Sequence, residues 1–269
     1  MGDTTVIPAR NAAAFFDLDK TTIATASMFA FSSTLRDAGF INSRLIMRAV
    51  WGRLVFKYLG ADHDRMEDMR NSALRLCKGW DQREVSALVT DALAEVIEPI
   101  VYREAVDEIS AHQAAGHMVF MVSASPEEVV VPLSKYLGAD GAVATIAETD
   151  REGKYTGEVE FYSYGPYKVD AIEALALEHD LDLDSSYAYT DSITDLPMLE
   201  AVGHPIVINP DKALARIAND RGWEVRWFSN TVPLRQRVGE HAKTGALVAG
   251  VGALAGGASW YVRSRRRTA

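Results

Sequence analysis

The sequence has little cysteine and no excess of positive charge. Cys77 is the single cysteine among 269 residues, which excludes an intramolecular disulfide and fits a reducing compartment. Lysine and arginine number 28 against 37 aspartates and glutamates, and the net charge of −9 argues against general nucleic-acid binding. Residues 1–11 lack a long apolar run, so no signal peptide is expected there. With 48% hydrophobic and 24% charged residues, the composition is that of a globular protein with one large domain, or a core with a smaller insertion.

One uncharged stretch occurs near the C-terminus, at residues 245–262, and a cluster of arginines follows it. Its length reaches the lower limit for a membrane-spanning helix, and Gly252 and Gly256 have the spacing of closely packed membrane helices. The stretch is rich in glycine and alanine, however, and only modestly hydrophobic. The sequence therefore leaves two alternatives for this segment: contact with a membrane, or a flexible tail or oligomer contact. The globular part of the chain is expected to be cytoplasmic, and the sequence does not indicate an oligomeric state.

The most informative junction is where an apolar run meets two acids. Residues 12–16 are typical of a short buried strand, and Asp17 and Asp19 follow it directly. Open α/β sheets bind ligands at the carboxyl ends of their strands. Two like charges so close repel each other, so the pair indicates a cation between them. An acidic turn after a strand is the simpler alternative for this motif alone.

Three later features support the first. A second apolar strand ends at Ser123 and Ala124, where a hydroxyl and free N–H groups suit a phosphate oxygen, although a serine helix cap is the simpler interpretation. Lys168 opens an amphipathic stretch and by itself is a surface lysine. Asp191 and Asp195 follow a third strand, where a helix cap and a first-turn acid would also explain them. All four features stand in order at strand ends or helix starts, which predicts a single site.

Apolar strands at 118–123, 186–190 and 205–208 alternate with helical stretches, which predicts βαβ units and a largely parallel sheet. Residues 142–161 are typical of a hairpin, and 223–228 of a last strand. Residues 26–105 show helical periodicity with little alternation. The expected organisation is a discontinuous core of 12–25 and 106–230, a helical module at 26–105, and a tail at 231–269.

With four motifs in this order, the chain resembles the haloacid dehalogenase superfamily over about residues 12 to 228. Within it, the likeness is to subfamily IB, which includes phosphoserine phosphatase. The resemblance implies an α/β, Rossmann-like three-layer core with a mostly parallel sheet and an inserted helical cap over the site. It also implies a phosphatase that uses Mg²⁺ and an aspartyl-phosphate intermediate to cleave a small phosphomonoester.

The resemblance assigns a role to each motif. Asp17 is the nucleophile, and its reference pKa of about 3.9 would leave it ionised at neutral pH. Asp19 protonates the leaving group and later deprotonates water, while its main-chain carbonyl helps to hold the metal. Asp17, Asp19 and Asp191 bind Mg²⁺, with Asp195 as a further ligand or a support. Six histidines in no ligand-like pair give no indication of zinc or iron.

The other motifs are expected to bind the phosphate group of the substrate. Lys168, Ser123 and the N–H groups around Ala124 would hold the phosphoryl oxygens. Thr21 would brace the catalytic loop by hydrogen bonding. Asp19 favours a phosphatase over a dehalogenase, because a halide leaves without a proton.

The sequence departs from phosphoserine phosphatases at two positions. Ala26 stands where they carry a glutamate that recognises the ammonium group of the substrate, and Thr194 stands where they tend to have asparagine. Phosphoserine is therefore one candidate substrate beside other small phosphomonoesters or a lipid phosphate. Arginines 36, 44, 48 and 53 are candidates for contact with the leaving group. A membrane-tethered binding or regulatory protein with little turnover remains the alternative function.

Overall fold

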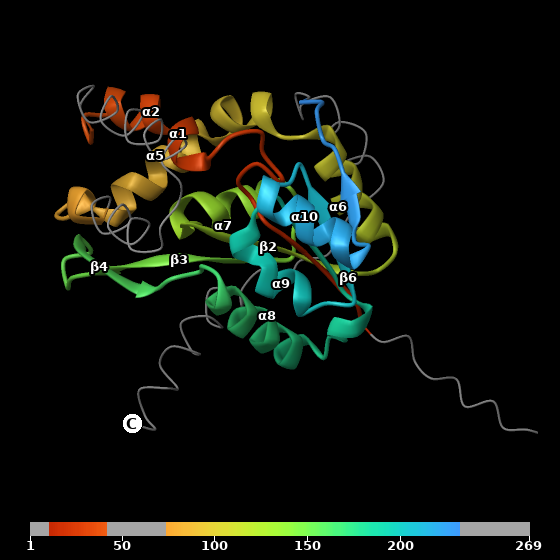
Figure 1. Cartoon of the computed structure of the whole chain (residues 1–269). Helices are drawn as coiled ribbons and strands as arrows, with labels where there is room; N and C mark the ends of the chain where they lie inside the picture. The colour runs from red at the N-terminus through yellow and green to blue at the C-terminus, as the bar shows by residue number, and fades with distance from the viewer. Residues whose placement is uncertain (1–10, 42–73, 232–269) are drawn as a thin grey trace, which may run out of the picture.

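A seven-stranded sheet in the order β4-β3-β2-β1-β5-β6-β7 forms the centre of this computed structural model, which describes residues 11–41 and 74–231 (Figure 1). Within this part of the chain only the pair β3 and β4 is antiparallel, which confirms the mostly parallel sheet expected from the sequence. The strands are β1 (Ala13–Phe16), β2 (Met118–Pro126), β3 (Gly141–Thr149), β4 (Tyr155–Phe161), β5 (Tyr187–Thr190), β6 (His204–Ile208) and β7 (Glu224–Arg226).

Strand β1 lies in the middle of the sheet, between β2 and β5. Its four residues are all buried, as the continuous apolar run predicts for a parallel strand covered on both faces. The chain builds the sheet outward from β1 through β2 to β3, and later continues on the other side with β5 to β7. The carboxyl end of β1 is therefore at the point where the strand order reverses, which is where open α/β sheets bind ligands.

Helices cover both faces of the sheet and complete three layers, as expected. Ala14 and Phe16 belong to one apolar cluster with residues of α5, α6 and α7, whereas Ala13 and Phe15 belong to another with residues of α8, α9 and α10. Figure 1 shows α7 and α8 on opposite sides of β3. The helices are α1 (Ser27–Ala30), α2 (Ser32–Asp37), α5 (Gln82–Ile97), α6 (Arg103–Ala114), α7 (Glu127–Tyr136), α8 (Pro166–His179), α9 (Leu196–Glu200) and α10 (Lys212–Arg221), with 3-10 turns η1 (Glu98–Ile100), η2 (Leu183–Ser185) and η3 (Ile193–Asp195).

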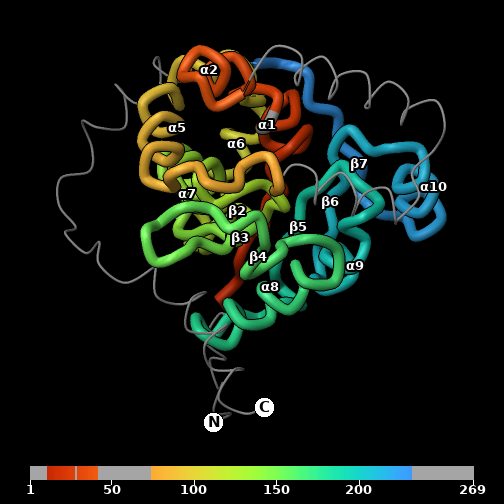
Figure 2. Tube along the Cα trace, turned by 90° about the vertical axis from the view of Figure 1, so that its left-hand side faces the viewer, coloured from red at the N-terminus to blue at the C-terminus, as the bar shows by residue number. Residues whose placement is uncertain are grey.

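The long insertion after β1 leaves the core and returns to it at one place. Ile23 pairs antiparallel with Val101, and the Ala24 N–H donates to the Ile100 carbonyl at 2.7 Å. Beyond this pairing, α1 and α2 lie close to α5 (Figure 2). Val89 and Leu93 of α5 pack in the same apolar cluster as the sheet. The division into a core and a cap at 26–105 stays a prediction.

Two element ends differ from the sequence expectation. Strand β2 continues past Ser123 to Pro126, which pairs with Thr145 of β3. Helix α7 therefore begins at Glu127, with Pro126 as its extended N-cap. The last strand is limited to Glu224–Arg226. The hairpin expected at 142–161 is confirmed as β3 and β4.

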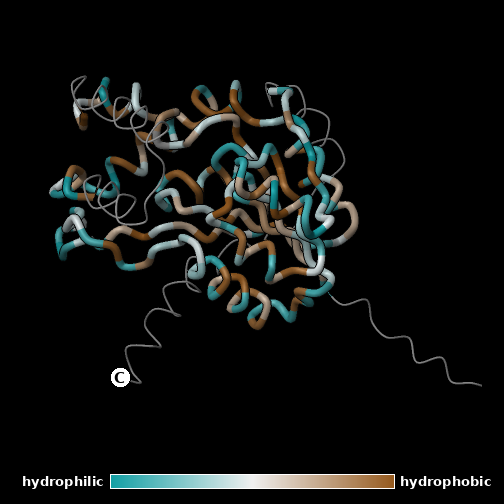
Figure 3. The backbone as a smooth tube through the Cα atoms, in the orientation of Figure 1, coloured by the Kyte–Doolittle hydropathy of each residue, from teal (hydrophilic) through white to brown (hydrophobic). Residues whose placement is uncertain are grey.

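Apolar stretches gather in the interior and hydrophilic ones lie at the periphery (Figure 3). Within residues 11–41 and 74–231, no helix has both the length and the apolar character needed to cross a membrane. The candidate membrane segment at 245–262 lies outside the described residues, as do arginines 44, 48 and 53.

Candidate active site

Strands β1, β2 and β5 bring three residues to the carboxyl edge of the sheet. Asp17 follows β1, Ser123 lies within β2 and Asp191 follows β5, and all three are buried. Asp17 continues the β1 pairing, since its N–H donates to the Tyr189 carbonyl of β5 at 2.9 Å. The central position of β1 thus fixes the backbone of Asp17 more firmly than a surface loop could.

Lys168 joins two of the acids. Its Nζ lies 2.7 Å from Asp17 Oδ1 and 2.8 Å from Asp195 Oδ2, and its side chain is only 2% exposed. Thr190 also donates to Asp195 Oδ2, at 2.8 Å. The ammonium therefore lies in a fixed position beside the proposed nucleophile, and it is not the surface lysine that the sequence alone would suggest.

A glycine sets the start of the helix that carries Lys168. Gly165, the N-cap of α8, has φ +54° and ψ −124°, a conformation that residues with a Cβ rarely adopt. Pro166 then occupies the first turn, where its fixed φ suits a helix. This turn directs the first residues of α8 toward the carboxyl edge of the sheet.

The buried charges are not balanced by the protein alone. The pKa of Asp17 is raised to about 8, mainly by burial, and the neighbouring Asp195 and Asp191 raise it further against the opposing effect of Lys168. Burial would lower the pKa of Lys168, but Asp17 and Asp195 outweigh it and raise that pKa above its ordinary value. One ammonium thus faces two carboxylates. Burial and the neighbouring acids therefore oppose the ionised form of Asp17 that the sequence predicts at neutral pH.

Asp191 is the third carboxylate of the site. Its pKa is raised to about 6, first by burial, while Lys20 lowers it and Asp195 raises it. Lys20 Nζ lies 3.5 Å from Asp191 Oδ2, so this exposed lysine forms an ion pair with an acid of the site. Asp211 anchors this loop, since its N–H donates to the Asp191 carbonyl and its Oδ2 accepts from the Ile193 N–H.

Asp19 points to two serines that the sequence did not single out. The Ser27 N–H donates to Asp19 Oδ1 at 2.8 Å, and Ser125 Oγ donates to Asp19 Oδ2 at 3.1 Å. The hydroxyls of Ser27 and Ser125 are themselves 2.8 Å apart. Both oxygens of the proposed acid/base group therefore have partners.

The bracing hydroxyl of the catalytic loop belongs to Thr22 instead of Thr21. Thr22 Oγ1 donates to the Asp17 carbonyl at 2.7 Å, whereas Thr21 Oγ1 is buried and has no hydrogen-bond partner among the described residues. Ser123 Oγ accepts from the Ser125 N–H at 3.1 Å, and the adjacent Ala124 carbonyl accepts from Thr145. These bonds fix the last residues of β2, which carry the expected phosphate contacts.

The donor set fits a hard divalent ion. Asp17 and Asp191 offer carboxylates and Asp19 a main-chain carbonyl, and all are oxygen ligands of the kind that Mg²⁺ prefers. The excess negative charge that raises the pKa values of Asp17 and Asp191 would be relieved by a cation. Residues 11–41 and 74–231 contain no group of three or more His, Cys, Asp or Glu side chains spaced to hold a metal. A substrate phosphate and water would have to complete the shell.

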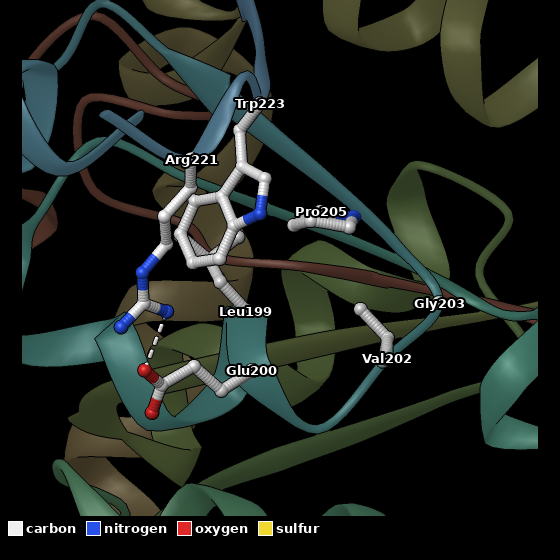
Figure 4. A pocket seen from close by; sticks show the side chains of 7 residues that line it. All are labelled: Leu199, Glu200, Val202, Gly203, Pro205, Arg221 and Trp223. Carbon is white, nitrogen blue, oxygen red and sulfur yellow. Dashed lines mark ion pairs between the residues drawn. The ribbon is translucent and has the colours of Figure 1, made fainter. Parts of the chain in front are cut away.

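A pocket lined by Glu200, Arg221 and Trp223 lies elsewhere (Figure 4). It is formed by the end of α9, the start of β6 and the end of α10, and therefore lies at the amino edge of the sheet. Arg221 pairs with Glu200 at 2.5 Å and stacks over Trp223 at 4.9 Å. None of the expected site residues lines this pocket.

Sequence reasoning and structure agree on which segments meet. The expected residues Asp17, Lys168 and Asp195 are in direct contact, and Asp191 affects the pKa of Asp17. The roles of Lys20, Thr22, Ser27, Ser125 and Asp211 in the hydrogen-bond and charge network were missed. Only Lys20 and Thr22 had a sequence signal, which is their place inside the first motif.

Comparisons with known proteins show the family of the chain. Residues 14–200 match the family model described as haloacid dehalogenase-like hydrolase. A probable phosphatase of Mycobacterium tuberculosis is 46% identical over 264 residues, covering 96% of this chain and 91% of the relative. A protein of that organism named phosphoserine phosphatase is 31% identical over 259 residues, covering 96% and 82%. A Bordetella pertussis structure of unknown function superimposes with a TM-score of 0.69 at 30% identity, covering 81% of this chain and 98% of the other.

Proposed function

This chain belongs to the haloacid dehalogenase-like hydrolase family, and we propose that it is a magnesium-dependent phosphatase that acts on a small phosphomonoester through an aspartyl-phosphate. The observation that carries the proposal is the buried ammonium of Lys168 between Asp17 and Asp195. A lysine so placed neutralises the nucleophile in part and offers its remaining N–H to a phosphoryl oxygen. The probable phosphatase among its relatives supports the same reaction class.

In the first half of the reaction, a carboxylate oxygen of Asp17 attacks phosphorus and the bond to the leaving oxygen breaks. Lys168 holds Oδ1 of Asp17, which leaves Oδ2 as the attacking atom. Asp19 donates its proton to the departing alkoxide. Lys168 and Ser123 bind the phosphoryl oxygens during transfer.

In the second half, Asp19 accepts a proton from water as the water oxygen attacks phosphorus. The bond between phosphorus and Asp17 breaks, which releases inorganic phosphate and restores the Asp17 carboxylate. Asp195 shares an oxygen with Lys168 and Thr190, and this arrangement favours a role in orienting Lys168 over a role as metal ligand. The groups that would hold Mg²⁺ are the carboxylates of Asp17 and Asp191 and the Asp19 carbonyl. Bound there, the ion screens the negative charge of nucleophile and phosphate.

The substrate is proposed to be small, with residues 26–105 acting as a cap over the site. Ala26 offers no carboxylate to a substrate ammonium, so we expect a leaving group without an obligatory amine. The relative named phosphoserine phosphatase keeps phosphoserine among the candidates.

Turnover of p-nitrophenyl phosphate by the wild type and by Asp17→Asn tests the proposal. With Mg²⁺ present, the variant should release phosphate at a rate lower by a factor of at least about 10³, because the amide cannot form the covalent intermediate. Asp220→Asn, an exposed change in α10, should retain wild-type turnover. Undiminished turnover of Asp17→Asn would contradict the mechanism.

The alternative of a binding or regulatory protein is separated by a panel of phosphorylated metabolites and lipid phosphates assayed with Mg²⁺. Robust turnover of any of them by the wild type rejects a protein without catalysis. Preference for a lipid phosphate would replace the small substrate proposed above.

A further inference from the structure

The carboxyl group of Asp19 is held from two directions, by Ser27, eight residues further along the chain, and by Ser125, 106 residues further along. Ser27 opens α1 in the segment that follows the catalytic loop, and Ser125 lies at the end of β2. Ser27 is fully buried and Ser125 is 6% exposed. These contacts connect three separate segments of the chain at the group proposed to transfer the proton.

The hydrogen bonds define a direction for the two hydroxyl protons. Ser125 has one hydroxyl proton, and it is donated to the carboxylate oxygen Asp19 Oδ2. Ser125 Oγ must then accept at its 2.8 Å contact with Ser27, so Ser27 Oγ is the donor there. The resulting chain runs from Ser27 through Ser125 to Asp19, and each bond polarises the next.

These hydroxyls differ from other serine hydroxyls of the protein. Ser134 of α7, which is also buried, donates to the Val131 carbonyl of its own helix, and Ser110 likewise donates to Val106. Such bonds serve the local backbone. Ser125 Oγ instead bonds to two side chains, Asp19 and Ser27, so its hydroxyl is directed at the catalytic loop.

Resting on the function proposed above, we infer that Ser125, supported by Ser27, is a positioning residue for Asp19. The two serines fix the rotamer of the carboxyl group, so that its transferable proton is directed at the oxygen of the leaving group. Proton transfer depends steeply on this geometry, because donor and acceptor must come within hydrogen-bond reach. Among the described residues, the two hydroxyls bond to each other and to Asp19 and not to Asp17 or Lys168, so both act through Asp19.

The test compares two substrates that differ in their need for a proton. A p-nitrophenolate leaves readily without one, whereas an alkoxide from a simple alkyl phosphate requires it. Ser125→Ala should lower kcat/KM for the alkyl phosphate by about 10- to 100-fold and for p-nitrophenyl phosphate by less than about threefold. Asp19→Asn should also lower the ratio of kcat/KM for the alkyl phosphate to kcat/KM for p-nitrophenyl phosphate, and by a larger factor. Inhibition by inorganic phosphate should stay unchanged, because Lys168 and Ser123 remain.

Further variants distinguish positioning from folding. Ser125→Thr retains the hydroxyl and should keep the ratio of the two kcat/KM values near that of the wild type. Ser134→Ala removes a buried hydroxyl elsewhere and should also leave this ratio at the wild-type value. Ser27→Ala keeps the N–H bond to Asp19 but removes the second hydroxyl, and should shift the ratio by about threefold; it serves if Ser125→Ala does not fold. Equal losses on both substrates, or an unchanged ratio in both variants, would overturn the inference while leaving the phosphatase intact. A wild type without turnover on any phosphomonoester would refute the proposed function, and the inference with it.

Discussion

Asp17 carries a charge that the fold disfavours. Because its folded pKa of about 8 lies above its ordinary value of 3.8, the folded state retains a proton that the unfolded chain has lost. The stability that depends on this proton is present below pH 4 and is lost as the pH rises toward 8. The burial of Asp17, the proposed nucleophile, thus disfavours its ionised form.

Asp17→Asn should therefore stabilise the protein while it abolishes turnover. In chelator-treated buffer at pH 7 we expect a gain of about 2–4 kcal/mol in the free energy of unfolding, narrowing toward pH 4. Lys168 keeps Asp195 as its partner in the variant, so no buried ammonium is left alone. Denaturant titrations of both proteins at several pH values measure this gap.

Added Mg²⁺ should raise the melting temperature of the wild type and have a much smaller effect on Asp17→Asn, because one ligand and most of the excess charge are gone. Thermal unfolding with and without Mg²⁺ checks this expectation. Equal stabilisation of the two proteins would argue against Asp17 as a metal ligand. A variant less stable than the wild type at pH 7 would contradict the raised pKa.

At this scale the sequence predicted the acids and the lysine, but not the residues that position them. Asp17, Asp191 and Asp195 follow strands, so their place at one edge could be inferred from order alone. Ser125 is separated from Ser27 by 98 residues and from Asp19 by 106, and such contacts leave no periodic pattern. The sequence assigned the bracing hydrogen bond to Thr21, whereas Thr22 makes it, for a similar reason. The backbone conformation of a tight loop decides which hydroxyl reaches the Asp17 carbonyl.

At the scale of elements, α8 is the helix on which the chemistry depends most. Its N-cap Gly165 has a positive φ, and an added Cβ would meet only the Thr194 carbonyl, at 3.8 Å. A larger residue is therefore disfavoured by the backbone conformation and not by lack of space. Three residues later Lys168 enters the site, so a shift of this turn moves the ammonium.

Gly165→Ala should cost about 1–3 kcal/mol of stability and also reduce kcat, because Lys168 leaves its position between Asp17 and Asp195. Gly116→Ala is the matched control: this glycine has φ +80° in the turn before β2, away from the carboxyl edge. It should lose a similar amount of stability and keep its turnover. Chemical denaturation and steady-state assays of both variants separate the two effects, and an equal loss of turnover would contradict the role of α8.

The sequence predicted the helices and strands better than it predicted individual side-chain contacts. Continuous apolar runs identified β1, β2, β5 and β6 because a parallel sheet covered on both faces demands them. Element ends were less predictable: the sequence indicated a strand that ends at 123, whereas the pairing of Pro126 with Thr145 extends β2. That pairing depends on β3, which is not visible from the residues around Pro126.

For the molecule as a whole, the proposed active site lies at the carboxyl edge of the sheet, and a buried hydrogen-bond network lies at the amino edge. At the amino edge, His112 Nδ1 lies 2.9 Å from His117 Nδ1, and His112 Nε2 lies 2.8 Å from the Tyr189 hydroxyl. Tyr189 in turn donates to Glu108 at 3.3 Å. This network joins α6 to β5, whose Tyr189 carbonyl also accepts from the N–H of Asp17.

Acid should weaken this connection. The pKa of His112 is lowered to about 4, first by burial and then by His117, against the opposite effect of Glu108. His112 therefore binds a proton near pH 6.5 in the unfolded chain but only near pH 4 in the folded protein. The free energy of unfolding consequently falls as the pH is lowered from about 6.5 to 4. We expect a loss of roughly 1–3 kcal/mol, smaller in His112→Gln than in the wild type. His204→Gln, at the same edge but exposed, should follow the wild type in denaturant titrations between pH 7 and 4; equal curves for all three proteins would contradict this origin.

The antiparallel contact of Ile23 with Val101 has a consequence for how such a chain can diversify. Since the polypeptide departs from β1 and rejoins α6 at neighbouring points, the loop-closure entropy of the intervening segment rises only slowly with its length. Insertions or deletions there need not displace β1 or Lys168. Selection can therefore remodel the proposed cap while the proposed catalytic residues of the core are inherited unaltered.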